Sequence, residues 1–200
     1  MSTWALVPVK ARHAGKQRLA SALAEPARAQ LVRRMLSHVL GVLADCPDID
    51  HILVMSPERD EMPPGIEWLP DPAAQMNDAL QLAVEGLQAR GATCVAVIAA
   101  DLPLLAAGEV RALVRAALAS GTAIAPDRGG TGTNAVCLRL PTALRFQFGP
   151  GSFAAHSAQG AVDGTPALIV VQPGLAFDVD VPADLKMLVA GGASDYGFLG

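Results

Sequence analysis

Three aspartates follow apolar runs at positions where they could hold a divalent cation. Asp101 comes just after the unbroken apolar run 94–99, and Asp178 and Asp180 alternate with apolar residues near the other end of the chain. Alternate side chains of an extended segment share a face, which places the last two carboxylates about 7 Å apart. A carboxylate beside an apolar core needs a partner, and Mg²⁺ accepts carboxylate and phosphate oxygens. The three acids therefore predict a metal site.

A helix cap is the competing interpretation of these acids. The helix after Asp101 is predicted over residues 108–119, which is too far along the chain for a cap. Asp180 precedes Pro182 and fits a cap, but that explains only one of the two paired acids. The apolar residues between them are expected to face the core: Phe177, Val179 and Val181.

Cations gather after the first predicted strand, which ends in Pro8 and Val9. They are Lys10, Arg12, Lys16 and Arg18. Cations at such a position can neutralise the charge that develops on a departing pyrophosphate. A solvated basic loop is the alternative. The chain has neither a Walker A loop nor a G-x-G-x-x-G fingerprint, so the cation cluster favours a triphosphate site of another kind.

Two glycine-rich loops complete the set of candidate binding segments. Residues 126–134 read PDRGGTGTN, and residues 148–153 read FGPGSF. Glycine lets a backbone approach an anion closely, and threonine hydroxyls and backbone N–H groups donate to it. Ser152 is expected near the N-terminus of a following helix, where anions bind. Both loops are therefore candidates for phosphate or carboxylate binding.

Covalent catalysis finds no support among the histidines and cysteines. The four histidines lack metal-binding spacing, and no G-x-S-x-G motif or Cys/His pair stands out. His38 is expected on a helix surface. His156 follows the second glycine loop, where a structural role is favoured over a phosphate contact. Cys46, Cys94 and Cys137 lie far apart without C-x-x-C spacing, and the last two are expected to be free thiols buried in strands.

The composition excludes several classes of protein. Of the 200 residues 52% are hydrophobic and 17% charged, which predicts an ordered chain. A net charge of −4 argues against nucleic acid or an anionic membrane as the main partner. No apolar run reaches the length of a membrane span, and no targeting leader is recognised. A cytoplasmic protein is expected.

The elements that must position these residues alternate along the chain. Apolar runs predict strands, and one-sided apolar periodicity predicts helices. The expected strands are 4–9, 51–56, 66–69, 94–99, 122–125, 135–140 and 167–171; the expected helices are 25–44, 73–90, 108–119 and one that begins near Pro182. This order predicts an α/β fold with a Rossmann-like, mainly parallel sheet and helices on both faces. Residues 1–190 are expected to form one domain, and 191–200 a flexible tail. Ligands then bind at the carboxyl ends of the strands.

At this point the motifs resemble a known family, the guanylyltransferases of coenzyme F-420 biosynthesis. That family includes 2-phospho-L-lactate guanylyltransferase and its phosphoenolpyruvate- and 3-phosphoglycerate-using relatives. The matching segments occur in family order: LVPVK at 6–10, KQRLA at 16–20, AADLPLL at 99–105, APDRGGTGTNA at 125–135, FGPGSF at 148–153 with His156, and DVDVPADL at 178–185. The pair TGTN and FGPGSF is the most specific part of the resemblance.

The resemblance implies a nucleotidyltransferase fold of the nucleotide-diphospho-sugar-transferase type. It implies that the metals, two Mg²⁺ ions, would bind Asp101, Asp178 and Asp180, and that the acceptor's carboxylate and phosphate would bind Thr133, Gly149 and Ser152. Lys10, Lys16 and Arg18 would face the triphosphate, next to Pro8 and Val9. Asn77, in QMNDAL, falls where the family has a segment near the base, although Met76 replaces a leucine and a glycine is missing. A homodimer is also expected from the family.

The reaction implied is transfer of GMP from GTP to the phosphate of a three-carbon acid, with release of pyrophosphate. The sequence leaves three acceptors open, namely 2-phospho-L-lactate, phosphoenolpyruvate and 3-phospho-D-glycerate. Three other interpretations remain: a metal-dependent glycosyltransferase that uses Asp178-Val179-Asp180 as a D-x-D motif, another nucleotidyltransferase of the same fold, and a non-catalytic nucleotide-sensing domain. The first leaves TGTN and FGPGSF unexplained. The second opens with a glycine-rich L-x-G-G loop, where this chain has Pro8-Val9-Lys10. The third would usually have lost one of the acids.

Overall fold

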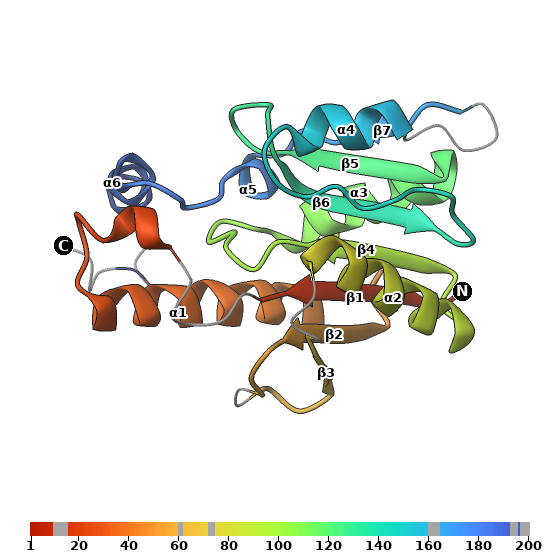
Figure 1. Ribbon diagram of the computed structural model, residues 1–200, viewed down its shortest axis with the longest axis horizontal. Helices are drawn as coiled ribbons and strands as arrows, with labels where there is room; N and C mark the ends of the chain where they lie inside the picture. Colours follow the sequence, from red (N-terminus) through yellow and green to blue (C-terminus); the bar gives the residue numbers. More distant parts are fainter. Residues whose placement is uncertain (10–15, 60–61, 72–74, 160–164, 193–195, 197–200) are drawn as a thin grey trace.

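The computed structural model describes residues 1–9, 16–59, 62–71, 75–159, 165–192 and 196 (Figure 1). Its strands are β1 (Thr3–Pro8), β2 (His51–Ser56), β3 (Ile66–Pro70), β4 (Cys94–Ile98), β5 (Thr122–Pro126), β6 (Thr133–Arg139) and β7 (Leu168–Ile169). Its α-helices are α1 (Glu25–Ala44), α2 (Met76–Ala89), α3 (Ala107–Ser120), α4 (Ser152–Gln159), α5 (Pro173–Ala176) and α6 (Pro182–Ala190), and a short 3-10 helix, η2, covers Gln17–Leu19.

The strands form a mixed, mainly parallel sheet in the order β3-β2-β1-β4-β6-β5-β7. Strands β1, β2, β3 and β4 pair in parallel, as do β5 and β7. Among the strands of the described residues, only β6 runs antiparallel, to both β4 and β5. The loop 127–132 that joins β5 to β6 is too short for a crossover, so the two strands must form a hairpin. The reversal brings the start of β6 to the same edge as the end of β4.

Helices cover both faces of the sheet, as the sequence predicted. Helices α1, α3 and α5 bury one face, which is lined by small residues such as Ala5, Ala96 and Ala123. Helix α2 crosses the other face, at the front of Figure 1, where it packs against Trp4 and Leu6. Burial of both faces explains the unbroken apolar run of β4, whose residues are all buried. No helix of the described residues is both long and apolar enough to cross a membrane.

The three cysteines are free and buried. Cys94 of β4 and Cys137 of β6 approach each other across the strand pair, with 3.4 Å between their Sγ atoms. Both belong to the core cluster on the face that α1 and α3 cover. The prediction that these two residues are buried thiols in strands is confirmed.

A third apolar cluster joins the C-terminal part of the chain to the start of α1. Phe177 and Val179 pack there with Leu185 of α6 and Leu31 of α1. Tyr196 is buried in the same cluster, whereas residues 193–195 and 197–200 of the expected tail lie outside the described residues. This cluster fixes the segment that carries Asp178 and Asp180 against the rest of the fold.

The segment 177–181 is extended, as predicted, but one expectation for it is wrong, because Val181 is 37% exposed instead of facing the core. The competing interpretation of Asp180 as a helix cap is not borne out either. The N-cap of α6 is Val181 and not Asp180, and the side chain of Asp184 accepts hydrogen bonds from the backbone N–H groups of both residues. Val181 turns outward because the chain begins its helical turn there.

Gly174 is the point where α5 packs most closely against the loop before α3. Its N–H donates to Glu109 at 2.8 Å, and a Cβ at this position would overlap the carbonyl oxygen of Leu104 and the carboxylate of Glu109. Since the Leu104 carbonyl belongs to the backbone, it cannot move aside freely. We expect Gly174→Ala to lower the free energy of unfolding by about 1–3 kcal/mol, measured by urea denaturation.

Gly86→Ala is the matched control for this substitution. Gly86 lies inside α2, and a Cβ there would have nothing within 4 Å. Alanine should therefore raise stability by roughly 0.5–1 kcal/mol through helix propensity. Equal stability of Gly174→Ala and the wild-type protein would contradict the close packing described for α5.

Candidate active site

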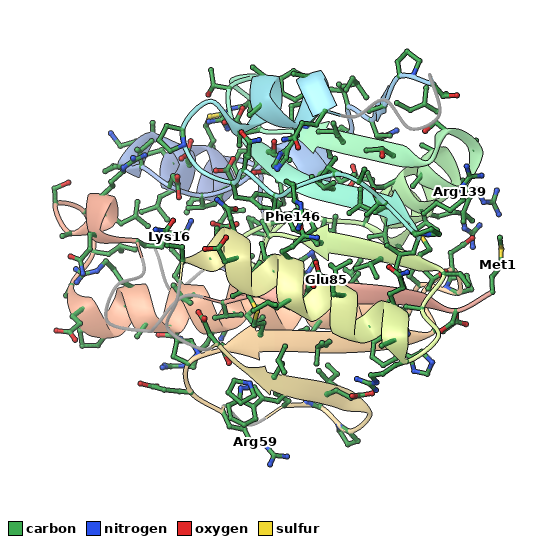
Figure 2. All side chains as sticks on the ribbon, turned by 45° about the vertical axis from the view of Figure 1, so that its right-hand side comes forward. Met1, Lys16, Arg59, Glu85, Arg139 and Phe146 are labelled. Carbon is green, nitrogen blue, oxygen red and sulfur yellow. The ribbon has the colours of Figure 1, made fainter. Side chains whose placement is uncertain are left out.

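The predicted acids and glycine loops meet at one edge of the sheet. Asp101 follows the carboxyl end of β4, and β6 begins beside it, where the Ala99 N–H donates to the carbonyl oxygen of Asn134 at 2.8 Å. Figure 2 shows Lys16 on the side of the molecule opposite to Met1, which precedes β1. Met1 marks the edge at which β1 begins, so the acids and loops lie at the opposite edge, where the parallel strands end. This is the edge at which α/β sheets bind ligands.

Lys16 connects two of the three acids. Its ammonium group forms an ion pair with Asp101 and a second one with Asp180, at 2.7 Å from Nζ to Oδ1. Only 9% of its side chain is exposed. Burial would lower the pKa of Lys16, but the two carboxylates outweigh burial, and the pKa is raised above its ordinary value. Lys16 is therefore an ammonium that stays charged near neutral pH, held between acids that lie 79 residues apart in sequence.

The backbone of Lys16 has an unusual conformation. Its φ of 54° and ψ of 39° fall in the left-handed region, which a residue other than glycine rarely adopts. It is the only such non-glycine residue in the described part of the chain. Such a conformation costs free energy and persists where the surroundings determine it. Here the two ion pairs of the side chain hold it in place.

Asp178 belongs to the same group of acids. Burial raises the pKa of its carboxyl group, and the neighbouring charges of Asp101 and Asp180 raise that pKa further. Asn134 opposes this shift because its Nδ2 donates to Asp178 Oδ1 at 3.4 Å, while also donating to the carbonyl oxygen of Leu175 at 3.0 Å. The three acids thus influence one another electrostatically, as expected for a site that attracts cations.

The donor set fits a hard divalent cation in its chemistry. It consists of three carboxylates, which are oxygen ligands that Mg²⁺ prefers. Burial, together with the charges of the other two acids, raises the pKa of Asp178. Within the described residues, however, no three His, Cys, Asp or Glu side chains are already grouped closely enough to hold an ion. The Lys16 ammonium instead lies between Asp101 and Asp180. Magnesium binding by these acids remains a prediction.

Asp184 and Arg128 hold the segment that carries Asp178 and Asp180. The Asp184 carboxylate accepts from the N–H groups of Asp180 at 2.9 Å and Val181 at 2.8 Å, and it pairs with Arg128. Burial alone would raise the pKa of Asp184, but these hydrogen bonds and Arg128 outweigh it and lower the pKa. Sequence analysis missed this role of Asp184. The signal was an aspartate two residues after Pro182, where helix capping boxes place an acid.

Arg128 also connects the first glycine loop to that segment. Its guanidinium lies 5.0 Å from the centre of the Phe177 ring and pairs with Asp184. Within the loop, the Asp127 side chain accepts from the N–H of Thr131 at 2.9 Å, and a Cβ on Gly132 would lie 2.6 Å from Asp127 Oδ2. A side chain at position 132 would therefore have to displace the Asp127 carboxylate that accepts from Thr131.

The second glycine loop lies against the first. The N–H of Phe153 donates to the carbonyl oxygen of Thr131 at 3.2 Å. Gly149 and Gly151 have φ angles of 133° and 74°, which favour glycine. Ser152 opens α4, as the sequence predicted, and is buried. The structure thus brings Thr133 at the start of β6, Gly149 in the second loop and Ser152 at the start of α4 close to two neighbouring loops. Their contact with an acceptor remains a prediction.

His156 is fully buried between the two loops. Its Nδ1 lies 3.0 Å from Thr133 Oγ1, and its Nε2 accepts from the N–H of Gln147 at 2.9 Å. Burial lowers the pKa of His156 to about 4, so the ring is neutral near pH 7. Phe148 contacts the ring edge-on, with 4.8 Å between centroids. The structural role favoured from the sequence agrees with these contacts. His38, expected on a surface, is partly buried and contacts the carbonyl oxygen of Leu105.

Asn77 forms hydrogen bonds to the backbone of Phe148, the first residue of the second glycine loop. Its Nδ2 donates to the carbonyl oxygen of Phe148 at 3.1 Å, and its Oδ1 accepts from the Phe148 N–H at 2.8 Å. The pair of bonds ties the start of α2 to a loop 71 residues away. Both polar atoms of the Asn77 amide are therefore bonded to Phe148 in this structure. The contact of Asn77 with the nucleotide base remains a prediction.

We expect Asn77→Ala to loosen the 148–151 loop. The substitution leaves the N–H and carbonyl groups of Phe148 without their partners, which costs about 1–3 kcal/mol if they remain shielded from water. Steady-state kinetics should show a higher KM for the acceptor and little change in the KM for GTP. Gln88→Ala, at an exposed position of α2, is the control. A rise confined to the KM for GTP would instead support the base contact.

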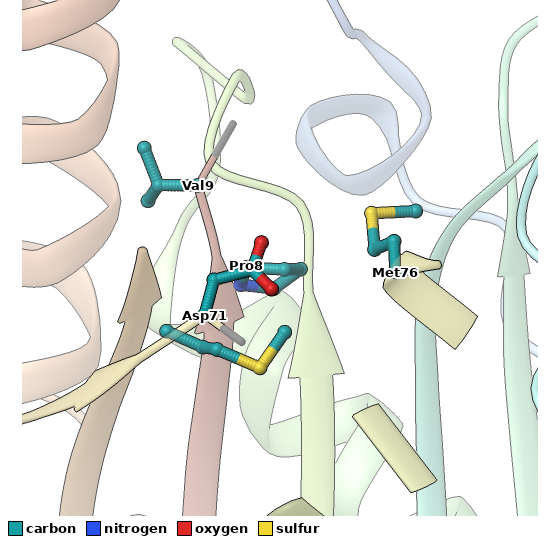
Figure 3. Close-up of a pocket in the computed structure, with 5 residues that line it drawn as sticks. Pro8, Val9, Asp71 and Met76 are labelled. Carbon is teal, nitrogen blue, oxygen red and sulfur yellow. The ribbon is translucent and has the colours of Figure 1, made fainter. Parts of the chain in front are cut away.

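Two of the remaining predicted nucleotide contacts, Pro8 and Val9, lie at the end of β1. Pro8 and Val9 line a small cavity with Met55, Asp71 and Met76 (Figure 3). Arg18 is mostly exposed, and its guanidinium lies 3.8 Å from Asp180. Lys10 and Arg12 lie outside the described residues. Lys16 is therefore the predicted cation that the structure places most firmly at the acids.

Comparison with known proteins decides the family of this chain. The family described as "Guanylyl transferase CofC like" matches residues 3–198. The chain belongs to this family. The phosphoenolpyruvate guanylyltransferase of Sphaerobacter thermophilus is 41% identical over 192 residues, which cover 94% of this chain and 93% of that protein. The protein of the same name from Rubrobacter xylanophilus is 36% identical and covers 98% of each chain. The prediction of a GTP-dependent nucleotidyltransferase is confirmed.

Solved structures place the fold among nucleotidyltransferases. A putative nucleotide-diphospho-sugar transferase from Desulfovibrio desulfuricans superposes with a TM-score of 0.82 at 17% identity, over 100% of this chain and 94% of that one. The 2-C-methyl-D-erythritol 4-phosphate cytidylyltransferase of Thermus thermophilus gives a TM-score of 0.51 at 19% identity, over 97% of this chain and 100% of that one. At these identities the likeness concerns the fold alone, and it confirms the predicted fold class.

Proposed function

We propose that this guanylyltransferase moves GMP from GTP onto the phosphate of phosphoenolpyruvate and releases pyrophosphate, as a step in coenzyme F-420 biosynthesis. Curated relatives with this activity in their names are 41% and 36% identical over nearly the whole chain. The pathway follows from the resemblance of the sequence motifs. Of the three acceptors that the sequence left open, the names of these relatives favour phosphoenolpyruvate.

The observation that carries the proposal is the convergence of Lys16, Asp101, Asp178 and Asp180 at one edge of the sheet. Lys16 pairs with two of these acids, and the charge of Asp101 acts on the third. A site of this kind suits a reactant that brings its own negative charge together with a divalent cation, as a nucleoside triphosphate does. The glycine loops beside it suit a second anion.

The reaction requires little covalent chemistry from the protein. An oxygen of the acceptor phosphate forms a bond to the α-phosphorus of GTP, and the bond from that phosphorus to the pyrophosphate oxygen breaks. The acceptor oxygen is already anionic near neutral pH, so no general base is needed. Catalysis then consists of positioning and charge stabilisation.

Separate groups of residues would bind the metal ions, stabilise the leaving group and bind the acceptor. Asp101, Asp178 and Asp180 would hold the two Mg²⁺ ions that we propose, which when bound would stabilise charge on the phosphate oxygens. Lys16, together with Arg18 and Lys10, supplies positive charge for the leaving pyrophosphate. Thr133, Gly149 and Ser152 bind the phosphate and carboxylate of the acceptor and hold it beside the nucleotide.

Pyrophosphate release tests the proposal. The purified protein is incubated with GTP and Mg²⁺ and with one of three acceptors: phosphoenolpyruvate, 2-phospho-L-lactate or 3-phospho-D-glycerate. We expect release with GTP and phosphoenolpyruvate, and little with ATP or CTP or after chelation of Mg²⁺. Release with another of the three acids would correct the acceptor. Absence of release with all three, despite binding of GTP, would contradict the proposed function.

A further inference from the structure

The hydrogen bonds of His156 determine which of its ring nitrogens carries the proton. The N–H of Gln147 donates to Nε2 at 2.9 Å, so this nitrogen must present a lone pair. A neutral imidazole then carries its proton on Nδ1, which lies 3.0 Å from Thr133 Oγ1. His156 therefore donates to the threonine hydroxyl. The side chain is fully buried, so water does not compete for either bond.

This arrangement leaves Thr133 with a proton to donate. Its oxygen accepts from His156, so its own O–H points away from the ring. Across the described residues, the Thr133 side chain has no hydrogen-bond partner besides His156. Threonine hydroxyls otherwise rotate to donate or accept as needed. Here the rotation is restricted, and the O–H of this buried side chain has no acceptor among the described residues.

The position of Thr133 indicates what that group is. It begins β6 at the end of the first glycine loop, directly before Asn134, whose side chain contacts Asp178. The second glycine loop lies beside it, through the bond from Phe153 to Thr131. A fixed O–H donor between two such loops suits an anionic oxygen, which accepts and cannot donate.

We infer that His156 is a positioning residue for acceptor binding, which holds the Thr133 hydroxyl as a donor to an anionic oxygen of the phosphorylated acid. This inference deepens the proposed function and rests on it. His156 itself does not touch the acceptor. Because burial lowers the pKa of His156 to about 4, the neutral ring keeps this arrangement throughout the neutral pH range.

Other contacts support a fixed position of the ring. Phe148 packs edge-on against His156, and Asn77 holds the backbone of Phe148 through two hydrogen bonds. Gln147, which donates to Nε2, directly precedes Phe148. The imidazole is thus held on both nitrogens and on its edge. Such packing preserves the orientation of the threonine hydroxyl before the acceptor arrives.

Two substitutions of His156 separate its two hydrogen bonds. In His156→Asn the side-chain amide nitrogen can take the place of Nδ1 and donate to Thr133. In His156→Gln the amide oxygen can take the place of Nε2 and accept from Gln147, while the donor to Thr133 is lost. Thr133→Val removes the hydroxyl at nearly constant volume, and Thr133→Ser keeps it. Each variant is measured for the KM of phosphoenolpyruvate, the KM of GTP and kcat.

The expected pattern is specific to a positioning role. His156→Gln and Thr133→Val should each raise the KM for the acceptor about 10- to 100-fold, as expected for a lost hydrogen bond to a charged group. The KM for GTP should stay close to the wild-type value, and His156→Asn and Thr133→Ser should be much less affected. His156→Gln added to Thr133→Val should produce no further rise. An unchanged acceptor KM in His156→Gln, or a second full rise in the double variant, would overturn the inference.

A measurement on the wild-type protein does not depend on how the variants fold. Nitrogen-15 chemical shifts of the histidine rings distinguish a proton on Nδ1 from one on Nε2. We expect His156 to carry its proton on Nδ1 at pH 7, and a proton on Nε2 would overturn the inference. Absence of turnover in the wild-type protein would contradict the proposed function, whereas the ring shifts test the hydrogen bond from His156 to Thr133 independently of turnover.

Discussion

Asp101→Asn should lower kcat/KM for guanylyl transfer about 1,000-fold or more. A metal-binding carboxylate contributes several kcal/mol of charge stabilisation to the transition state, and about 1.4 kcal/mol corresponds to each factor of ten. The substitution keeps the shape of the side chain and removes its charge. Asp101 also pairs with Lys16 and raises the pKa of Asp178. The substitution should therefore lower kcat and raise the concentration of Mg²⁺ needed for half-maximal rate.

Asp48→Asn is the matched control for this experiment. Asp48 also forms ion pairs, with Arg111 and Arg115, but it precedes β2 and so lies at the opposite edge of the sheet. Its substitution should leave kcat/KM within a factor of about two and lower stability only slightly, as for other partly exposed pairs. If Asp101→Asn were about as active as Asp48→Asn, Asp101 would have no role in the active site.

Lys16→Met should have the second-largest effect, a fall in kcat of about 100- to 1,000-fold. Removal of one preorganised group that stabilises transition-state charge has a cost of this size. Methionine keeps most of the volume and flexibility of lysine and lacks the ammonium group. The substitution also leaves Asp101 and Asp180 without the cation that now lies between them. Divalent cations should therefore raise the Tm of this variant more than that of the wild-type protein.

Lys186→Met provides the comparison, because Lys186 is exposed on α6 and its loss changes the net charge equally. It should retain wild-type turnover and show an ordinary response to Mg²⁺. If Lys16→Met keeps full activity, the buried ammonium has only a structural role. If Mg²⁺ stabilises both variants equally, the carboxylates beside Lys16 do not bind the ion.

The sequence predicted the elements of the fold closely where periodicity was strong. The helix expected over 25–44 has these bounds, and the apolar run 94–99 forms β4 and ends one residue earlier. The strand expected over 167–171 is only Leu168–Ile169 in the structure. Both side chains are exposed, so burial of apolar surface does little to extend this strand. The apolar pattern of β6 does not indicate its antiparallel direction, whereas the short loop before it is typical of a hairpin.

The site could be predicted only as a set of residues at strand ends. The strand-end rule brought Asp101 and the glycine loops to one edge. It could not place the Lys16 ammonium between Asp101 and Asp180, because that contact depends on where a loop side chain points. Nor could it predict the hydrogen bond between Asn134 and Asp178 or the one between His156 and Thr133, since both join residues that are distant in sequence. These contacts follow from packing, which local patterns do not encode.

The central claim is most directly tested by following the phosphorus atoms of GTP through the reaction. The protein is supplied with Mg²⁺, carbon-14-labelled phosphoenolpyruvate and GTP labelled with phosphorus-32 at either the α or the γ position. We predict that the α label and the carbon label appear together in one new product, and that the γ label appears only in pyrophosphate. A γ label transferred to the acceptor, or an α label that never joins the carbon label, would contradict guanylyl transfer to this acid.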